Sequence, residues 1–281
     1  MSKLPNLLIF IFIVSSLQLF GAPEAGCGFA GTEIKVSSGF DKAGTPSERF
    51  NTFNNLVRDG KIGREEGITH LNALLQELKE DYYRRGGKDF PRNSWSFPLE
   101  GNNAQSLSAA SDKGYIASGY DYFSGNRHGG HPSFDIFIRD RNQDCLDDLS
   151  GVPVKVQSLG GGLVVAMESA WQEGSTLRGG NYIWVYDPGN ELLVYYAHNG
   201  NLAVGLGDIV KPGALLGVVG RSGLNAAKRR SPTHLHLTVL AIKDGRPSPL
   251  NVYQDLAGVG KVFSAGSVVH TASKTLRRVN R

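Results

Sequence analysis

Hydrophobic and polar positions divide the 281-residue chain into a region of helical period and a longer region of strand period. Helices are predicted over Ser47–Arg58 and Arg64–Arg85. The second carries apolar residues three and four positions apart, which places them on one face of an amphipathic helix. Gly86 and Gly87 follow it, as glycines often do at a helix end. We interpret both as structural helices that pack on the main domain, and covering a site is the less favoured alternative. The apolar face comprises Ile68, Leu71, Leu74, Leu75 and Leu78.

From Trp95 onward, short apolar runs alternate with turns that contain glycine and proline. Two clear runs, Tyr182–Tyr186 and Leu192–Ala197, flank the turn sequence Asp187-Pro188-Gly189-Asn190. Many short strands with such turns are typical of an antiparallel β domain, sandwich-like or barrel-like. The predicted fold class is therefore mainly β, α+β overall, with an N-terminal helical segment. We place the domain boundary in the loop 86–94.

The first residues have the pattern of an export signal. Lys3 precedes an apolar run from Leu7 to Phe20, which is shorter than the about 20 apolar residues of a membrane span. Cleavage after Gly21 would leave a mature chain in which no transmembrane span is expected, and an uncleaved N-terminal anchor is the alternative. We predict an exported protein of the periplasm or cell envelope, or a secreted one. Its predicted parts are a signal peptide at 1–21, a helical segment at 22–94, a β domain at 95–255 and a C-terminal tail at 256–281.

Net charge and cysteine content say little about which molecules the protein binds. The net charge of +4 is compatible with an acidic envelope polymer, but we favour the simpler interpretation of a solvated surface. No basic run is dense enough to indicate nucleic-acid binding. Cys27 and Cys145 could pair after export. Cys27 also follows Ala25-Gly26, in weak likeness to a lipid-attachment site, but Glu24 stands where an apolar residue is expected, so pairing and a lipid anchor both stay open.

A histidine and an aspartate four residues apart, His131 and Asp135, open one predicted strand. Side chains alternate along a strand, so residues four apart share a face. The two could therefore converge on one metal ion if the strand bends or begins near Pro132. Phe134 and Ile136 would then occupy the opposite face, toward the core.

A second strand carries His234 and His236 on one face and Leu235 and Leu237 on the other, and His198 ends a third. Packing alone explains two imidazoles on one side of a strand poorly. Zinc accepts neutral imidazole and carboxylate oxygen, and a catalytic site uses three protein ligands and leaves a fourth position for water. Spacing does not decide which histidine of the pair would be the ligand. The others could act as base, acid or stabiliser of a developing oxyanion.

These motifs together resemble the lysostaphin/LytM-type peptidoglycan metallopeptidases. The similarity covers roughly residues 95–252, and its motifs occur in the family's order. They are Phe97-Pro98-Leu99, His131-x-x-x-Asp135, Tyr196-Ala197-His198, a Gly-Asp-x-Val-x-x-Gly turn at Gly207–Gly213, and His234-Leu235-His236.

The resemblance implies a zinc ion held by His131, Asp135 and His236, with His198 and His234 as the catalytic histidines beside it. It also implies an antiparallel sheet with a groove for an extended peptide, and hydrolysis of peptide bonds in peptidoglycan stem peptides or cross-links. The alternative is a catalytically quiet module of the same fold that binds the wall or activates another hydrolase.

The chain departs from the family pattern around the last motif. Ser231-Pro232-Thr233 stands where a small-residue turn such as Thr-Gly-Pro is usual, Leu237-Thr238 stands where Phe-Glu is usual, and the stretch 224–230 is longer and more basic. The segment 140–148 is also polar and acidic. These differences bear on substrate choice and remove no predicted ligand. His128 lacks the four-residue spacing to Asp135, so we expect it in a loop at the rim of the groove.

Overall fold

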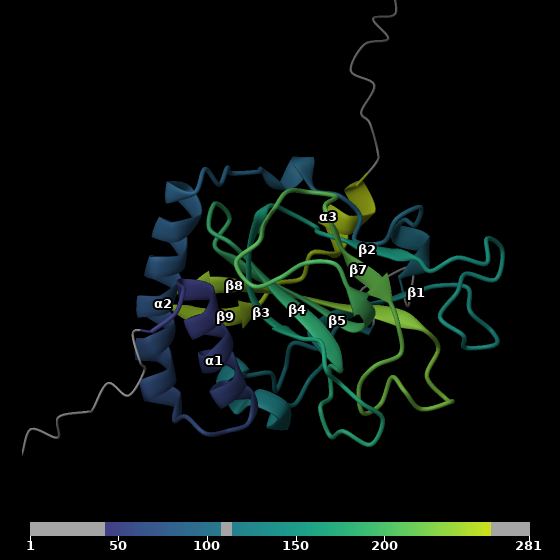
Figure 1. Cartoon of the computed structure of the whole chain (residues 1–281), viewed down its shortest axis with the longest axis horizontal. Coiled ribbons are helices and arrows are strands. Elements are labelled where there is room, and N and C mark those ends of the chain that lie inside the picture. The colour runs from purple at the N-terminus through teal and green to yellow at the C-terminus, as the bar shows by residue number, and fades with distance from the viewer. Residues whose placement is uncertain (1–42, 108–113, 260–281) are drawn as a thin grey trace, which may run out of the picture. The chain divides into compact units, whose positions relative to one another are not determined.

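The computed structural model describes residues 43–107 and 114–259, in which nine strands form one hydrogen-bonded sheet with two long helices beside it (Figure 1). The signal peptide predicted at 1–21, Cys27 and most of the predicted tail lie outside these residues. No helix within them is long and apolar enough to cross a membrane. The strands are β1 (Ser133–Phe137), β2 (Lys155–Gln157), β3 (Gly162–Glu168), β4 (Asn181–Asp187), β5 (Leu192–Leu202), β6 (Ile209–Val210), β7 (Leu215–Val219), β8 (His234–Lys243) and β9 (Arg246–Pro249).

The two long helices have local start signals. Thr45 caps α1 (Pro46–Arg58), since its side chain accepts a hydrogen bond from the Glu48 amide while the Glu48 carboxylate accepts one from the Thr45 amide. This reciprocal cap satisfies two amides that a helix start otherwise leaves without partners. The predicted α2 (Arg64–Arg84) is confirmed, and Leu71, Leu74, Leu75 and Leu78 of its apolar face are buried. A short helix α3 (Tyr253–Gly258) follows the sheet.

The strand order β1-β8-β5-β4-β3-β6 puts the longest strands, β5 and β8, at the centre. All pairings are antiparallel, as the turn-rich sequence predicts. The far half of β5 pairs with β7, which also pairs with β2, and β9 extends the edge of β8 that β1 leaves unpaired. The mainly β fold with an N-terminal helical segment is confirmed. The division into domains at 22–94, 95–255 and 256–281 stays a prediction.

The two faces of the sheet pack against different elements. Phe134 and Ile136 of β1 and Leu235, Leu237 and Val239 of β8 belong to one apolar cluster, which also takes in α3 and the segment around Trp95. We call the side of the sheet that carries this cluster the closed face. It is the core-facing side that the alternation of β1 and β8 predicts.

The opposite side, which we call the site face, is covered in part by the helices. Phe50 and Phe53 of α1 and the leucines of α2 share a second cluster with Trp184 of β4 and Leu240 of β8. Along β8 this face therefore changes from polar residues at His234, His236 and Thr238 to apolar Leu240, because alternate residues share a face. The helices lie over the apolar part of the face and leave the imidazoles outside their cluster.

Candidate metal centre and pocket

Three adjacent strands bring the predicted ligands together. Asp135 of β1 stands opposite His236 of β8, and His236 stands opposite Ala197 of β5, one residue before His198. The pairing of these strands thus brings together polar residues from three segments that are distant in the sequence. His131 joins them from just before β1, where it forms an isolated bridge with Ile116. The strand begins one residue after Pro132. We expected a strand start near Pro132 if His131 and Asp135 were to point at one metal ion.

The donor atoms of His131, Asp135 and His236 lie within 4.8 Å of one another. Asp135 Oδ1 is 3.0 Å from His236 Nδ1 and 3.4 Å from His131 Nε2. Ligand atoms on a tetrahedral zinc ion with bonds of about 2.0–2.1 Å lie about 3.3 Å apart. Both separations are close to that edge length, and two imidazoles and one carboxylate are ligands that zinc accepts. The donor set therefore fits a zinc ion.

The ring orientation of each of these two histidines also suits a metal. His131 Nδ1 lies 3.2 Å from the Gly114 carbonyl oxygen, which can only accept, so Nδ1 carries a proton and Nε2, which faces Asp135, is the nitrogen that would bind a metal. His236 is turned the other way, with Nδ1 toward Asp135 and Nε2 3.5 Å from Thr238 Oγ1. Partners of this kind on the far ring nitrogen commonly orient metal-binding histidines.

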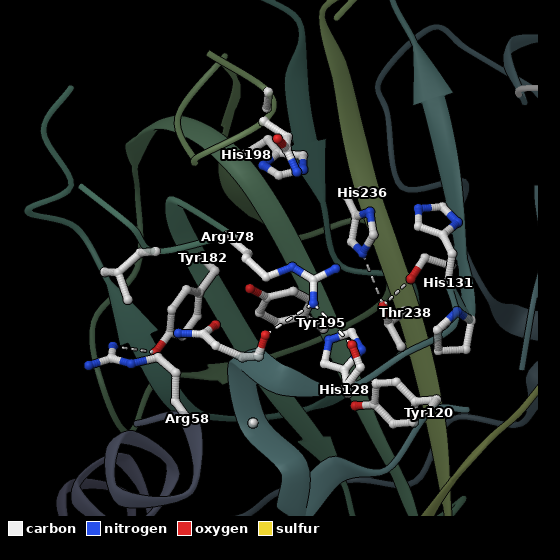
Figure 2. Close-up of a pocket in the computed structure, with 18 of the residues that line it drawn as sticks. Arg58, Tyr120, His128, His131, Arg178, Tyr182, Tyr195, His198, His236 and Thr238 are labelled. Atoms are coloured by element: carbon white, nitrogen blue, oxygen red, sulfur yellow. Dashed lines mark hydrogen bonds between the residues drawn. The ribbon is translucent and has the colours of Figure 1, made fainter. Parts of the chain in front are cut away.

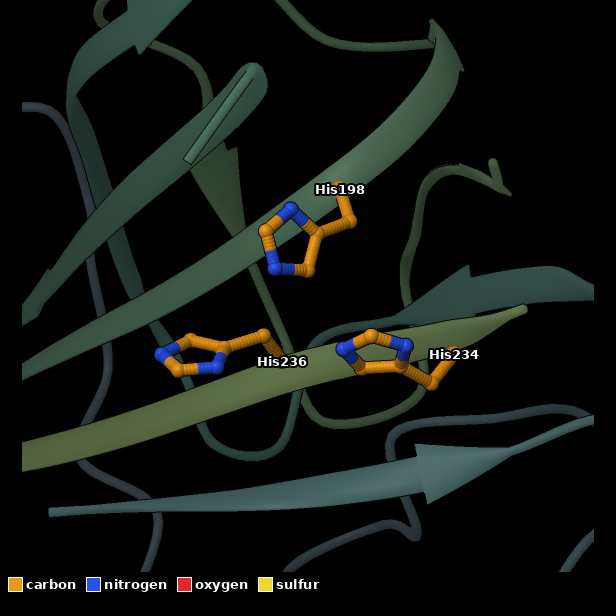
Figure 3. Close-up of side chains that lie close together, drawn as sticks. All are labelled: His198, His234 and His236. Carbon is orange, nitrogen blue, oxygen red and sulfur yellow. The ribbon is translucent and has the colours of Figure 1, made fainter. Parts of the chain in front are cut away.

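The two predicted catalytic histidines lie close to His236 (Figure 3), and Nε2 of His234 is 3.7 Å from Asp135 Oδ1. Nδ1 of His198 is 2.8 Å from the Ser222 carbonyl oxygen, and Nδ1 of His234 is 2.7 Å from the Pro232 carbonyl oxygen. Each Nδ1 therefore donates, and each Nε2 is left with a lone pair. Nitrogens of His198, His234 and His236 also lie within 4.8 Å of one another, so His236 is common to two groups that could hold a metal.

His198 sits in an uncommon backbone conformation. We expected it at the end of a strand, but β5 continues to Leu202 and bends at His198, whose φ is +66°. A non-glycine residue rarely adopts this left-handed region, and such residues are frequent at functional sites. Gly223 makes the bend possible, because a Cβ there would lie 2.9 Å from His198 Nδ1 and 2.5 Å from the Arg178 carbonyl oxygen.

Burial and neighbouring charges set the protonation of the site. Burial alone raises the pKa of Asp135, but hydrogen bonds from His131 and His236 outweigh it and hold that pKa well below its ordinary value. The same interaction raises the pKa of His131. Burial lowers the pKa of His236, and burial together with the neighbouring His236 and His234 lowers the pKa of His198 further. Near pH 7 the Asp135 carboxylate is thus ionised, and the imidazoles of His236 and His198 are neutral.

These groups line one pocket of about 310 Å³, whose walls come from four parts of the chain (Figure 2). Asn54 and Arg58 of α1 form one wall, and residues 120–130, which include the 3₁₀ helix Tyr122–Arg127, form the next. The β3–β4 loop contributes Arg178, and the loop before β8 contributes Ser231. The helical segment, which we interpreted chiefly as structural, therefore packs on the sheet and also lines the pocket.

Some pocket residues had no signal in the sequence, whereas others had one. Arg178 and Arg58 lie in a polar loop and on a helix without any motif, and only tertiary packing brings them to the pocket. Thr238 does continue the period of His234 and His236, so strand alternation could have identified it. His128 lies on the pocket wall with its ring centroid 4.7 Å from that of Tyr120, in the loop position expected for it.

Part of the chain matches a known protein family. Residues 149–249 match the model of peptidase family M23. This stretch includes His198, His234 and His236, whereas His131 and Asp135 precede it. No curated protein matches the chain.

Solved structures of peptidases are similar to parts of the chain. A putative glycyl-glycine endopeptidase LytM from Ruminococcus gnavus is 28% identical over 58% of this chain and 59% of its own, with a TM-score of 0.36. Lysostaphin, an antimicrobial peptidase from Staphylococcus simulans, is 23% identical over 60% of this chain and 57% of its own, with a TM-score of 0.34. A zinc-containing peptidase from Vibrio cholerae is 20% identical over 58% of this chain and 40% of its own, with a TM-score of 0.35.

The chain thus covers less than two thirds of each of these three proteins. Its family assignment depends instead on the match at residues 149–249 and on the motifs that meet in the sheet. Residues 149–249 of this chain thus match peptidase family M23, and the motifs that meet in the sheet resemble those of its lysostaphin/LytM type.

Proposed function

We propose that the protein is an exported, zinc-dependent endopeptidase that hydrolyses peptide bonds in peptidoglycan stem peptides or cross-links. The observation that carries the proposal is the convergence of His131, Asp135 and His236 at separations that suit one zinc ion. Two further histidines, His198 and His234, stand in the same pocket with fixed tautomers. The family match supports peptide hydrolysis as the reaction class.

We assign zinc to His131 Nε2, Asp135 Oδ1 and His236 Nδ1. The group His198, His234 and His236 is the alternative, since zinc also accepts three imidazoles. Two separations favour the first group, because the distances from Asp135 Oδ1 to His236 and to His131 are 3.0 Å and 3.4 Å, near a tetrahedral edge. In this assignment His198 and His234 are left for proton transfer. A bound zinc ion would supply Lewis acidity, which lowers the pKa of water and polarises a carbonyl group.

The chain's own residues would perform the rest of the catalysis. His198 and His234 each keep a lone pair on Nε2, because Nδ1 donates to a backbone carbonyl oxygen. Either ring can therefore accept a proton as a general base and, once protonated, donate a hydrogen bond to developing negative charge. Their rings are 5.0 Å apart between centroids, so both can reach the same reacting group.

The test combines metal analysis with cleavage of purified muropeptides. The full chain should contain about one zinc ion per molecule, as a three-ligand site predicts. His131→Ala and Asp135→Ala should lose both zinc and cleavage. His198→Ala should keep zinc and lose turnover, which separates the ligand role from the catalytic one. His70→Ala is the matched control, because it removes an imidazole of α2 that does not line the pocket.

Unchanged cleavage by Asp135→Ala would contradict the ligand assignment. A wild-type chain that binds zinc and cell wall but cleaves no muropeptide would favour the alternative, a quiet wall-binding or hydrolase-activating module of the same fold.

A further inference from the structure

The charges of the pocket lining are unbalanced. Among the described residues that line it, Asp135 carries the one carboxylate, whereas Arg58 and Arg178 carry two guanidinium groups. Asp135 already interacts with His131 and His236. No other acidic side chain lines the pocket, so an anionic group on a ligand would be favoured beside an arginine that has no carboxylate partner elsewhere.

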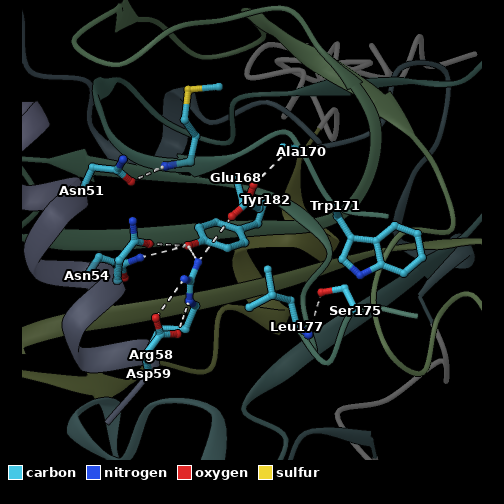
Figure 4. Close-up of polar contacts among 12 residues, drawn as sticks. Asn51, Asn54, Arg58, Asp59, Glu168, Ala170, Trp171, Ser175, Leu177 and Tyr182 are labelled. Carbon is cyan, nitrogen blue, oxygen red and sulfur yellow. Dashed lines mark hydrogen bonds and ion pairs between the residues drawn. The ribbon is translucent and has the colours of Figure 1, made fainter. Parts of the chain in front are cut away.

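The two arginines differ in how far the protein neutralises them. Arg58 of α1 donates to Asp59 at 2.8 Å, lies 3.5 Å from Glu168, and donates to the Tyr182 hydroxyl at 3.2 Å (Figure 4). Its charge is thus compensated, and its geometry joins α1 to β3 and β4. Arg178 has no carboxylate partner within the described residues. Within the described residues it donates two hydrogen bonds of 3.2 Å, both from Nη1, to the carbonyl oxygens of Asn126 and His128.

These two bonds leave one edge of the Arg178 guanidinium unused. Nη1 is occupied, whereas Nε and Nη2 donate to no described residue. A guanidinium group can bind a carboxylate through two parallel N–H···O bonds, which gives both strength and orientation. Figure 2 shows Arg178 extending across the pocket, and its positive charge adds to burial in lowering the pKa of His128.

Backbone hydrogen bonds fasten the residues on both sides of Arg178 next to the histidines. The Leu177 carbonyl oxygen accepts from the Leu224 amide at 2.9 Å, and the Gly179 carbonyl oxygen accepts from the His198 amide at 3.0 Å. The same segment that positions His198 therefore positions the arginine. A ligand group bound by Arg178 would be oriented relative to the catalytic histidines at little entropic cost.

We propose that Arg178 is a substrate-binding residue that holds a free carboxylate of the peptide, so that the pocket prefers acidic peptides. The inference depends on the function proposed above, which it sharpens by naming the substrate class. The carboxylate could belong to the C-terminus of the peptide or to an acidic side chain. Both sources offer the same two oxygen atoms to the guanidinium edge.

The test uses the full, zinc-loaded chain and a synthetic stem-type tetrapeptide in three forms: all carboxyls free, amidated at the C-terminus, or amidated at the side chain. Binding is measured by titration calorimetry under conditions in which chromatography finds the peptide intact, and KM and kcat are measured separately. Arg178→Gln should weaken binding of the free peptide and raise its KM about 10- to 100-fold, as expected for a lost charge-assisted pair. The kcat should change far less.

Amidation at the recognised carboxyl should weaken binding to the wild type by a similar factor and should add nothing in Arg178→Gln. The form that behaves in this way identifies the source of the carboxylate. Arg178→Lys should fall between the wild type and Arg178→Gln, since it keeps the charge but loses the fork. Arg229→Gln is the matched control, because it removes the same charge from an exposed loop outside the pocket, where salt screens it.

The inference fails if the wild type binds the free and both amidated peptides equally, or if Arg178→Gln weakens all three by the same factor. Zinc content and the melting temperature are measured for every variant and identify one that is misfolded. If Arg178→Gln is misfolded, the comparison of Arg178→Lys with the wild type tests the inference instead. If the wild type binds the acidic peptide through Arg178 but hydrolyses none of the three, the proposed function fails and the carboxylate site stands.

Discussion

The two faces of β8 are built from alternate residues of one short segment, yet they differ in almost every physical respect. Leu235, Leu237 and Val239 of the closed face are fully buried among apolar side chains. His234 and His236 of the site face line a pocket, where Nδ1 of His234 is bonded to the Pro232 carbonyl oxygen and Nδ1 of His236 faces Asp135. One face gains its stability from dry packing, whereas the other keeps polar groups where a metal and a substrate can reach them.

This contrast has a clear physical meaning. Apolar contacts are non-directional, so many residues of similar volume could fill the closed face. The site face depends on particular atoms at particular separations, such as the 3.0 Å between Asp135 Oδ1 and His236 Nδ1. A substitution on the closed face should therefore change the free energy of unfolding, and one on the site face should change what the protein binds.

The largest expected effect is the stabilisation that zinc gives through the site face. Because the metal binds only the folded site, free zinc at 1,000 times its Kd should raise the free energy of unfolding by about 4 kcal/mol. Urea unfolding with and without a chelator measures this difference. His236→Ala should remove it, and His70→Ala should keep it. A wild-type chain whose unfolding midpoint does not respond to zinc would contradict the metal site.

A cavity in the closed face should act on stability alone. Leu237→Ala removes a fully buried side chain and should lower the free energy of unfolding of the zinc-free protein by about 3 kcal/mol. The folded fraction should still bind one zinc ion, because the histidines lie on the other face. The volume-conserving Leu237→Met should cost less than about 1.5 kcal/mol. Loss of zinc affinity in folded Leu237→Ala would show that packing on the closed face also determines the geometry of the site face.

A smaller effect is expected where α1 meets the site face. The Tyr182 hydroxyl accepts from Asn54 at 3.1 Å and from Arg58 at 3.2 Å, and its side chain is buried. Tyr182→Phe leaves these donors without that partner and should lower the free energy of unfolding by about 2 kcal/mol. Zinc stoichiometry should not change. Tyr83→Phe is the control, since it removes an exposed hydroxyl that is bonded to Asp89. An equal loss of unfolding free energy in both variants would show that burial of the Tyr182 hydroxyl adds nothing to its contribution to stability.

Much of this molecule follows from local sequence patterns. The leucine period of α2, the turn at 187–190 and the alternation along β1 and β8 act over a few residues, so they predict helices, strands and the closed face without knowledge of the fold. The same alternation places His131 with Asp135, and His234 with His236, on shared faces. The order of the motifs supplied the family resemblance and, through it, the choice of His236 as a ligand.

Other features depend on contacts between distant segments. The pairing of β1 with β8 brings Asp135 next to His236, about 100 residues later in the chain. The pocket walls likewise come from α1, the residues before β1 and two loops, none of which carries a motif that points to the pocket. Arg178 is the clearest case, because its position depends on backbone hydrogen bonds to Leu224 and His198. The sequence determined which residues could bind zinc, since strand alternation is local, and the tertiary structure decided what surrounds them, since that depends on chain segments meeting in space.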